Sequence, residues 1–285
     1  MENVNINWFP GHMAKTRREL QEKLKLIDLV IELRDARIPE SSSNPMLKDL
    51  IGNKPKLIIL CKSDMADSNV TKAYINSFNE KKIIALDVDL VGGRNTNLIK
   101  PYIRKASLQI LERRKQKGII NKEIKIMVVG IPNVGKSTFI NKIAGKKSLN
   151  TGNKPGVTKN SNIWIKINNE FLLLDTPGIL WPKFESKDVA LKLSLCGAIK
   201  DELLPIRDLT IYGLNYLKEY YPAKLIERYR LTNLDDVKDI IDEIGKNRGC
   251  LKKGGEIDYE KVYKAFLQDV KNAKIGAISY DRYEG

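Results

Sequence analysis

A glycine-rich segment in the middle of the chain carries residue types that bind nucleotide phosphates. It reads GIPNVGKST from Gly130 to Thr138, follows the apolar run IKIMVVG, and opens a helical pattern. Glycines let the backbone approach phosphate oxygens, and the start of a helix adds partial positive charge. Lys136 would place its ammonium on the outer phosphates, and Ser137 would ligate Mg²⁺. The spacing and its flanks therefore predict a nucleotide site. The predicted contacts come from Asn133, Val134, Gly135, Lys136, Ser137 and Thr138.

Two further segments supply groups that such a site needs. Asp175 ends the apolar run FLLLD and would hold Mg²⁺ through water, and Gly178, three residues later, would offer its N–H to a γ-phosphate. An ordinary Pro-Gly turn is the alternative, but the phosphate segment upstream favours the functional interpretation. Thr158 lies in a loop between the two segments and would reach the same Mg²⁺ once a γ-phosphate orders that loop. The predicted metal ligands are Ser137, Thr158 and Asp175.

A segment that recognises guanine is expected upstream of the phosphate segment. Cys61-Lys62-Ser63-Asp64 directly follows the apolar run KLIIL, and no [NT]-K-x-D follows Gly178. Asp64 would accept hydrogen bonds from the ring N–H and the amine of guanine, which adenine does not offer. The stem of Lys62 would cover the ring, and Ser63 lies between them. An ATP-using enzyme is an open alternative, against which Asp64 argues.

Short apolar runs alternate with helical patterns up to about residue 185, which predicts an α/β fold with a mostly parallel sheet and helices on both faces. Strands are expected at 28–33, 56–61, 83–87, 124–130, 161–167 and 171–175. Beyond this point only helical patterns occur. The expected domains are therefore 1–185, with an N-terminal helix at 13–26, and an all-helical domain at 186–285.

Composition narrows the class of protein. The 285 residues are 42% hydrophobic and 30% charged, which excludes a disordered chain. No apolar run is long enough to span a membrane, three scattered cysteines favour a reducing cytosol, and one histidine excludes a multi-histidine zinc site.

The net charge of +15 is concentrated, because residues 100–170 hold 16 Lys and Arg against 3 Asp and Glu. This indicates a polyanion partner, with a well-solvated lysine-rich surface as the alternative. Residues 100–125 contain the candidates Arg104, Lys105, Arg113, Arg114, Lys115, Lys117, Lys122 and Lys125. The helical domain offers only local candidates, which are Lys246, Arg248, Lys252 and Lys253.

Over essentially its whole length the sequence resembles the circularly permuted GTPases of the RbgA/YlqF kind, which assemble the large ribosomal subunit. The resemblance rests on Trp8–Met13, on Asp35-Ala-Arg-Ile-Pro39, on the segments above in their permuted order, and on Asp258–Lys261. It implies a permuted P-loop GTPase domain followed by a helical domain that binds RNA. It also implies a cytoplasmic, monomeric GTP hydrolase that uses Mg²⁺, binds a late precursor of the large subunit and its ribosomal RNA in the GTP state, and has no membrane or DNA partner.

Two positions depart from the family pattern. The guanine motif usually begins with asparagine, where this chain has Cys61, and the second guanine loop is usually a Ser-Ala pair, where Val88 stands between two aspartates. The second guanine loop contributes only backbone N–H groups to the base, so the change at Val88 is mild. The lost asparagine removes about 0.5–1.5 kcal/mol, against about 1.5–3 kcal/mol for each bond to Asp64. We therefore expect guanine selectivity to persist with weaker affinity.

The catalytic group is not in its usual place. Many small GTPases orient the attacking water with a glutamine after Asp-x-x-Gly, where this chain has Ile179. The resemblance points instead to His12, in an N-terminal loop flanked by Pro and Gly; helix capping or RNA contact are the alternatives for it. His12 and Lys136 are the predicted catalytic residues. Asn133 resembles GTPases that take K⁺ beside the phosphates. A non-enzymatic RNA-binding scaffold with a degenerate nucleotide site is the second hypothesis.

Overall fold

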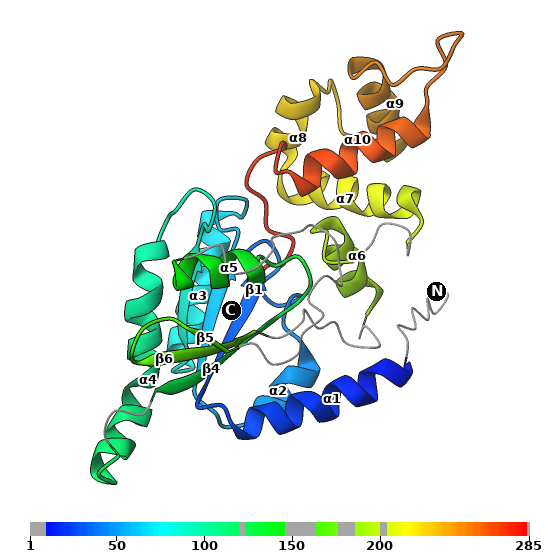
Figure 1. Ribbon diagram of the computed structural model, residues 1–285. Coiled ribbons are helices and arrows are strands. Elements are labelled where there is room, and N and C mark those ends of the chain that lie inside the picture. The colour runs from blue at the N-terminus through cyan, green and yellow to red at the C-terminus, as the bar shows by residue number, and fades with distance from the viewer. Residues whose placement is uncertain (1–9, 120–122, 146–163, 176–185, 200–203, 284–285) are drawn as a thin grey trace. The chain divides into compact units, whose positions relative to one another are not determined.

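The computed structural model describes residues 10–119, 123–145, 164–175, 186–199 and 204–283, which form two compact units (Figure 1). The first unit is Met1–Phe184 together with Asp281–Gly285, and the second is Glu185–Tyr280. This division differs from the expected domain of 186–285 at its end, because the last residues belong with the first unit. No helix among the described residues is long and apolar enough to cross a membrane.

A six-stranded sheet forms the centre of the first unit, with the strand order β3-β2-β1-β4-β6-β5. All neighbouring strands run parallel except β5, which pairs antiparallel with β6. This confirms the predicted mostly parallel α/β fold. The strands are β1 (Leu29–Asp35), β2 (Lys56–Cys61), β3 (Ile84–Val88), β4 (Ile124–Gly130), β5 (Trp164–Lys166) and β6 (Phe171–Asp175).

The strand order reverses in the middle of the sheet. From the centre, the chain passes outward through β1, β2 and β3, and then returns to place β4 beside β1 before it reaches β5 and β6. The order therefore reverses between β1 and β4. In open parallel sheets, ligands bind at the carboxyl ends of the strands beside such a switch point.

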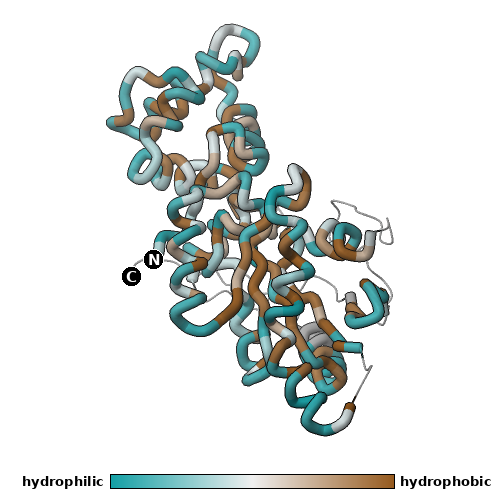
Figure 2. Tube along the Cα trace, turned by 90° about the vertical axis from the view of Figure 1, so that its left-hand side faces the viewer, coloured by the Kyte–Doolittle hydropathy of each residue, from teal (hydrophilic) through white to brown (hydrophobic). Residues whose placement is uncertain are grey.

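The strands are apolar because both faces of the sheet are covered, and Figure 2 shows the hydrophobic stretch through the middle of this unit. Every residue of β1 is buried. Side chains of α1 and α2 pack on Val30, Met127 and Leu174, and those of α3 pack on β2. The helices of this unit are α1 (Pro10–Lys25), α2 (Pro45–Ile51), α3 (Ser68–Glu80), α4 (Ile99–Gln116) and α5 (Lys136–Ala144), with a 3-10 turn at Thr96–Leu98.

The regular elements in the described part of the second unit are all helices, apart from one isolated β-bridge between Leu251 and Ile257. Its helices are α6 (Lys187–Leu195), α7 (Ile206–Tyr220), α8 (Pro222–Tyr229), α9 (Val237–Asn247) and α10 (Tyr259–Lys271). Asp269 of α10 is buried and accepts hydrogen bonds from Arg228, Arg248 and the hydroxyl of Tyr229. Arg248, a candidate RNA contact from the sequence, is thus part of the packing of this unit.

The last described residues are held in the first unit by a buried carboxylate. Asp281 accepts hydrogen bonds from the backbone N–H groups of Glu40 and Ser41 at 2.8 and 2.7 Å, and from the hydroxyl of Ser41 at 2.6 Å. Tyr74 of α3 donates to the carbonyl of Arg282 and packs against the ring of Tyr283. The helical unit is therefore an insertion, since the chain returns to the first unit after Tyr280.

A candidate nucleotide site at the carboxyl edge of the sheet

The phosphate segment connects β4 to α5 by a loop with unusual backbone angles. Asn133 and Gly135 have φ values of 59° and 106°, and α5 begins at Lys136. A Cβ atom at Gly130 would lie 2.8 Å from the carbonyl oxygen of Leu33, so glycine is required where β4 passes β1. Lys136 is buried at 8% exposure. Left-handed residues directly before a helix start are typical of loops that can direct backbone N–H groups at an anion.

The predicted guanine segment follows β2, which lies two strands from β4, so both segments are at the carboxyl edge of the sheet. Lys62 has a φ of 58°, the backbone N–H of Ser63 donates to the carbonyl of Val88 at 3.2 Å, and Asp64 is exposed. Ser63 is buried, and its hydroxyl oxygen has no hydrogen-bond partner in the part of the chain that the structure describes. The exposed carboxylate of Asp64 is thus accessible to a ligand at this edge.

The loop after β3 approaches the phosphate segment. Val88 is the last residue of β3 and lies opposite Cys61 in the ladder. Asp89 closes the loop by accepting hydrogen bonds from the N–H groups of Val91 and Gly92 at 2.9 and 2.7 Å. The side chain of Leu90 lies against Gly135, 3.4 Å from where a Cβ atom would stand. The predicted second guanine loop and the phosphate loop are therefore neighbours.

Asp35 occupies the end of β1, between the guanine and phosphate segments. Its carboxylate accepts from Arg37 Nε and Nη2 at 2.9 and 2.8 Å, and from Lys62 Nζ at 3.0 Å. Burial raises the pKa of Asp35, but the positive charges of Arg37 and Lys62 outweigh burial and hold that pKa well below its ordinary value. The carboxylate therefore stays ionised and fixes both cations.

The sequence alone assigned no role to Asp35 or Arg37, although both lie in a segment that carries the family resemblance. The available signal was the charged segment Arg34-Asp35-Ala36-Arg37 after the apolar run DLVIEL, since the carboxyl ends of parallel strands share one edge. Cys61, the departure at the guanine motif, is fully buried. Burial first, and then the charge of Asp35, raise the pKa of its thiol to about 12.

The residues predicted to hold Mg²⁺ are only partly described. Ser137 lies in the first turn of α5, and Asp175 ends β6 opposite Val128 of β4, so the backbone brings both to the carboxyl edge. A hydroxyl and a carboxylate are hard oxygen donors that suit Mg²⁺ held with substrate phosphates. Thr158, Gly178 and Ile179 lie outside the described residues.

His12 is placed differently from the expectation. The backbone of α1 begins at Pro10, so His12 belongs to the first turn of this helix and not to a loop before it. Proline is favoured in a first helical turn because the N–H it lacks has no partner there. The side chain of His12 lies outside the described part of the structure.

The comparisons with known proteins agree with this geometry. A family model described as "50S ribosome-binding GTPase" matches residues 125–242. The chain is similar to two solved structures of YlqF: a GDP-bound form (TM-score 0.70, 25% identity, 94% of this chain and 100% of the other) and a GNP-bound form from Thermotoga maritima (0.64, 26%, 95% and 99%). The fold is therefore that of a P-loop GTPase.

The sequence relatives define the family more narrowly. Ribosome biogenesis GTPase A of Bacillus licheniformis is 48% identical over 98% of this chain and 99% of its own length, and its namesake in Thermotoga maritima is 32% identical over 98% and 95%. The chain belongs to the ribosome biogenesis GTPase A family. This confirms the family that the sequence resembles.

Proposed function

We propose that this protein binds a late precursor of the large ribosomal subunit in its GTP state and leaves after hydrolysing GTP. The observation that carries this proposal is the common sheet edge, where the loops after β2, β3 and β4 meet with Asp64 exposed and Lys136 at the helix start. The family supports a role in ribosome assembly. The same proposal makes the protein a cytoplasmic monomer with no membrane or DNA partner.

Cosedimentation with large ribosomal subunits tests this proposal. We expect the protein to pellet with subunits in the presence of a non-hydrolysable GTP analogue and to stay in the supernatant with GDP or without nucleotide. Lys136→Ala, which removes the charge on the outer phosphates, serves as the nucleotide-blind control. Equal pelleting in all three nucleotide states would contradict a GTP-controlled cycle.

The proposed contacts divide by chemistry. Lys62, Ser63, Asp64 and Val88 would bind the base, and Asn133 to Thr138 would bind the phosphates with Gly178. Mg²⁺ would be held by Ser137, Thr158 and Asp175, and it would neutralise the charge that develops on the transferred phosphoryl group.

For the attacking water we propose His12, since Ile179 does not hydrogen-bond water. A positioned water-orienting group contributes about 10²–10⁴-fold to a rate. We expect His12→Ala to bind GTP normally and to lose hydrolysis stimulated by large subunits in single-turnover assays. Equal stimulated rates in the parent and His12→Ala would remove His12 from this role.

K⁺ beside Asn133 is the proposed second source of positive charge. The φ of Asn133 is 59°, which gives a second explanation for an asparagine at this position, because asparagine tolerates a left-handed backbone. Asn133→Gly keeps that backbone and removes the side chain, so it separates the two. We expect it to abolish faster hydrolysis in K⁺ than in Na⁺; an unchanged K⁺ effect would assign the asparagine to backbone shape alone.

Ribosomal RNA is the proposed polyanion, and the end of α4 is the proposed surface for it. Arg113, Lys115 and Lys117 are exposed there. Arg114, which the sequence placed with them, is half-buried instead and pairs with Asp28 at 2.8 Å, so it holds α4 to the sheet. Arg104 is also paired, with Glu170.

A charge-reversal series tests this surface. Exchanging Arg113, Lys115 and Lys117 for Glu should lower the salt dependence of RNA binding by about two to three units of log–log slope, roughly one for each phosphate that the variant no longer neutralises. The matched control exchanges the exposed lysines Lys72, Lys81 and Lys82 at α3. An equal decrease of slope in both variants would show general charge attraction and contradict a site at α4.

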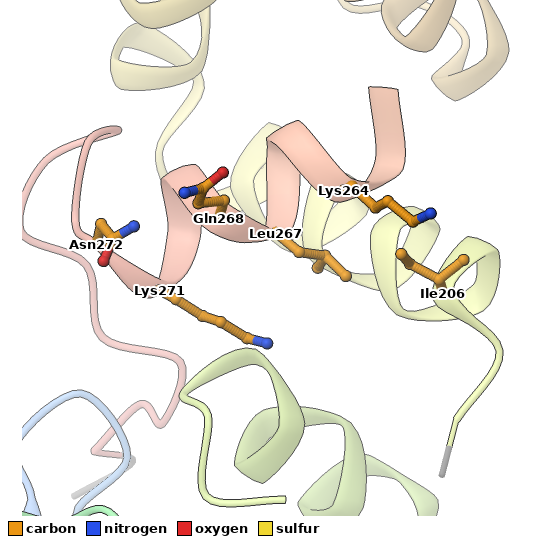
Figure 3. A pocket seen from close by; sticks show the side chains of 6 residues that line it. All are labelled: Ile206, Lys264, Leu267, Gln268, Lys271 and Asn272. Carbon is orange, nitrogen blue, oxygen red and sulfur yellow. The ribbon is translucent and has the colours of Figure 1, made fainter. Parts of the chain in front are cut away.

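The helical unit offers a second basic surface. A pocket of about 290 Å³ beside α10 is lined by Ile206, Leu267, Gln268 and Asn272 with two lysines, Lys264 and Lys271. Both lysines extend from the same side of α10 as Leu267, which lies between them in the sequence (Figure 3). Lys264 is also paired with Glu260 one turn away, at 3.4 Å. Amide and ammonium groups around a small apolar floor suit a phosphate and a sugar, so we include this pocket among the proposed RNA contacts.

The alternative function is a scaffold that binds RNA without hydrolysing GTP, and Cys61 with Ile179 favours it. Single-turnover hydrolysis in the presence of large subunits separates the two. An undetectable rate together with unimpaired RNA binding would establish the scaffold.

A further inference from the structure

Asp35 lies where the strand order of the sheet reverses. It is the last residue of β1, it is 1% exposed, and β4, which leads into the phosphate segment, is the next strand. In open parallel sheets, ligands bind beside such a switch point, at the carboxyl ends of the strands.

The three charged groups here differ in what they can reach. Arg37 forms a two-bond pair with Asp35, and the side chains of both are 2% exposed. Lys62 Nζ donates to Asp35 Oδ2 at 3.0 Å, the same oxygen that accepts from Arg37 Nη2, and the side chain of Lys62 remains 25% exposed. Arg37 therefore neutralises the carboxylate inside the protein, and Lys62 is the member of the group that faces outward.

The backbone at Lys62 is held as firmly as its side chain. A φ of 58° is uncommon for a residue other than glycine, and hydrogen bonds from Ser63 N–H to Val88 and from Met65 N–H to Lys62 close the loop around it. A lysine carries about 2 kcal/mol of rotamer entropy, which a ligand must otherwise remove when it binds. Here much of that freedom is lost before any ligand arrives.

We propose that Asp35 is a positioning residue for the guanine nucleotide, which fixes Lys62 so that its methylene stem is already in place to cover the base. The inference rests on the proposed assignment of Cys61 to Asp64 as the guanine motif. The competing role is structural, since Asp35 also accepts from the N–H of Arg37 and its own N–H donates to the hydroxyl of Ser42.

A double-mutant cycle separates the two roles. The dissociation constant of a fluorescent GDP is measured for the full chain and for Asp35→Asn, Lys62→Met and the double variant. Preorganising one long side chain is worth about a two- to tenfold change in affinity, so Asp35→Asn should weaken GDP binding by that factor. The double variant should bind no worse than Lys62→Met alone, because Asp35 acts through Lys62.

Asp28→Asn is the matched control at the opposite end of β1. Asp28 also pairs with an arginine, Arg114, and accepts from the N–H of Lys125, but it lies away from the carboxyl edge. The Asp28→Asn variant should have a lower melting temperature and an unchanged affinity for GDP. If Asp35→Asn does not fold, Asp35→Glu keeps the charge beside Arg37, displaces it by one methylene, and has the same expected sign.

Three results would overturn the inference in different ways. If Asp35→Asn bound GDP as tightly as the parent, Lys62 would not need Asp35 to hold it in place. A weakening that persists in full in the Lys62→Met background would show that Asp35 acts by another route. Parent-like GDP affinity in both Lys62→Met and Asp64→Asn would remove the guanine motif itself, and the inference with it.

Discussion

Two buried aspartates, one in each unit, bind two cationic side chains each and yet have different surroundings. Asp35 of β1 binds Arg37 and Lys62, whereas Asp269 of α10 binds Arg228 and Arg248. The helical unit also satisfies Asp269 with the hydroxyl of Tyr229, and its arginines come from α8 and from the residue that follows α9. In the sheet unit one cation, Lys62, belongs to a loop with left-handed backbone at the carboxyl edge of the sheet.

A buried ion pair alone therefore does not indicate a functional site. Buried ion pairs in general contribute little net stability but are costly to break, and we expect the same at both aspartates. What distinguishes Asp35 is its place, because a sheet switch point and a loop with a nucleotide motif converge there. Asp269 lies in a helix junction with no such loop among the described residues.

Removing the charge of Asp269 should have the greatest consequence of the variants considered. Asp269→Asn leaves two arginines without a counter-charge, so the free energy of unfolding of the second unit should fall by about 3–5 kcal/mol. Chemical denaturation followed by circular dichroism measures this, with Asp239→Asn, an exposed position in the first turn of α9, as the control. A stability equal to that of the control would assign the packing to the apolar contacts alone.

Lys136→Ala should affect the sheet unit and leave the helical unit intact. Removing one charge-assisted hydrogen bond to a phosphate costs about 1.5–3 kcal/mol, so GTP should bind ten- to a hundredfold more weakly and hydrolysis should become undetectable. Nucleotide titration and a phosphate-release assay measure both, while the unfolding of the helical unit should be unchanged. Normal hydrolysis in this variant would invalidate the phosphate-loop assignment.

Asp64→Asn tests the ligand edge of the sheet unit at the base. The preference for GTP over ATP should disappear, because the amide does not accept from both guanine donors as the carboxylate does. Each such bond is worth about 1.5–3 kcal/mol. Competition between the two nucleotides measures the preference, and Asp67→Asn, three residues later at the cap of α3, is the control for a lost charge. An undiminished preference in Asp64→Asn would place the guanine site elsewhere.

The partners that distinguish the two aspartates could not be predicted from the sequence. The strands and most helices follow from apolar runs and periodicity, and the phosphate segment follows from its spacing, because these signals are local. The partners of Asp35, Asp269 and Asp281 lie up to 241 positions away, and no periodicity encodes such contacts. The return of the chain after Tyr280 was missed for the same reason.

The stability of the first unit should depend on acid pH through Asp35. The pKa of Asp35 is held below its ordinary value, so its ionised form stabilises the fold above about pH 4, and that stability is lost as pH falls toward the folded-state pKa. The free energy of unfolding of the first unit should therefore fall below about pH 4. Asp35→Asn should be less stable at neutral pH and show a shallower decline in acid; an equal slope would place the acid sensitivity elsewhere.

A smaller change is expected at Cys61, which stands where the family pattern has asparagine. Its thiol is fully buried opposite Asp35 and Val88 in the ladder, and its raised pKa keeps it neutral. Cys61→Asn restores one hydrogen bond and should tighten GTP by up to about tenfold. The larger side chain should also lower the melting temperature of the nucleotide-free protein, because a packed core resists added volume.

Cys61→Ala is the control for this change, since it removes the thiol without adding an amide. We expect it to leave GTP affinity unchanged, so that the difference between Cys61→Asn and Cys61→Ala isolates the restored bond. Equal affinities in the two variants would mean that the ion group of Asp35 and Lys62 already holds the guanine loop in place. The missing asparagine would then be compensated by the same buried carboxylate that distinguishes this unit from the helical one.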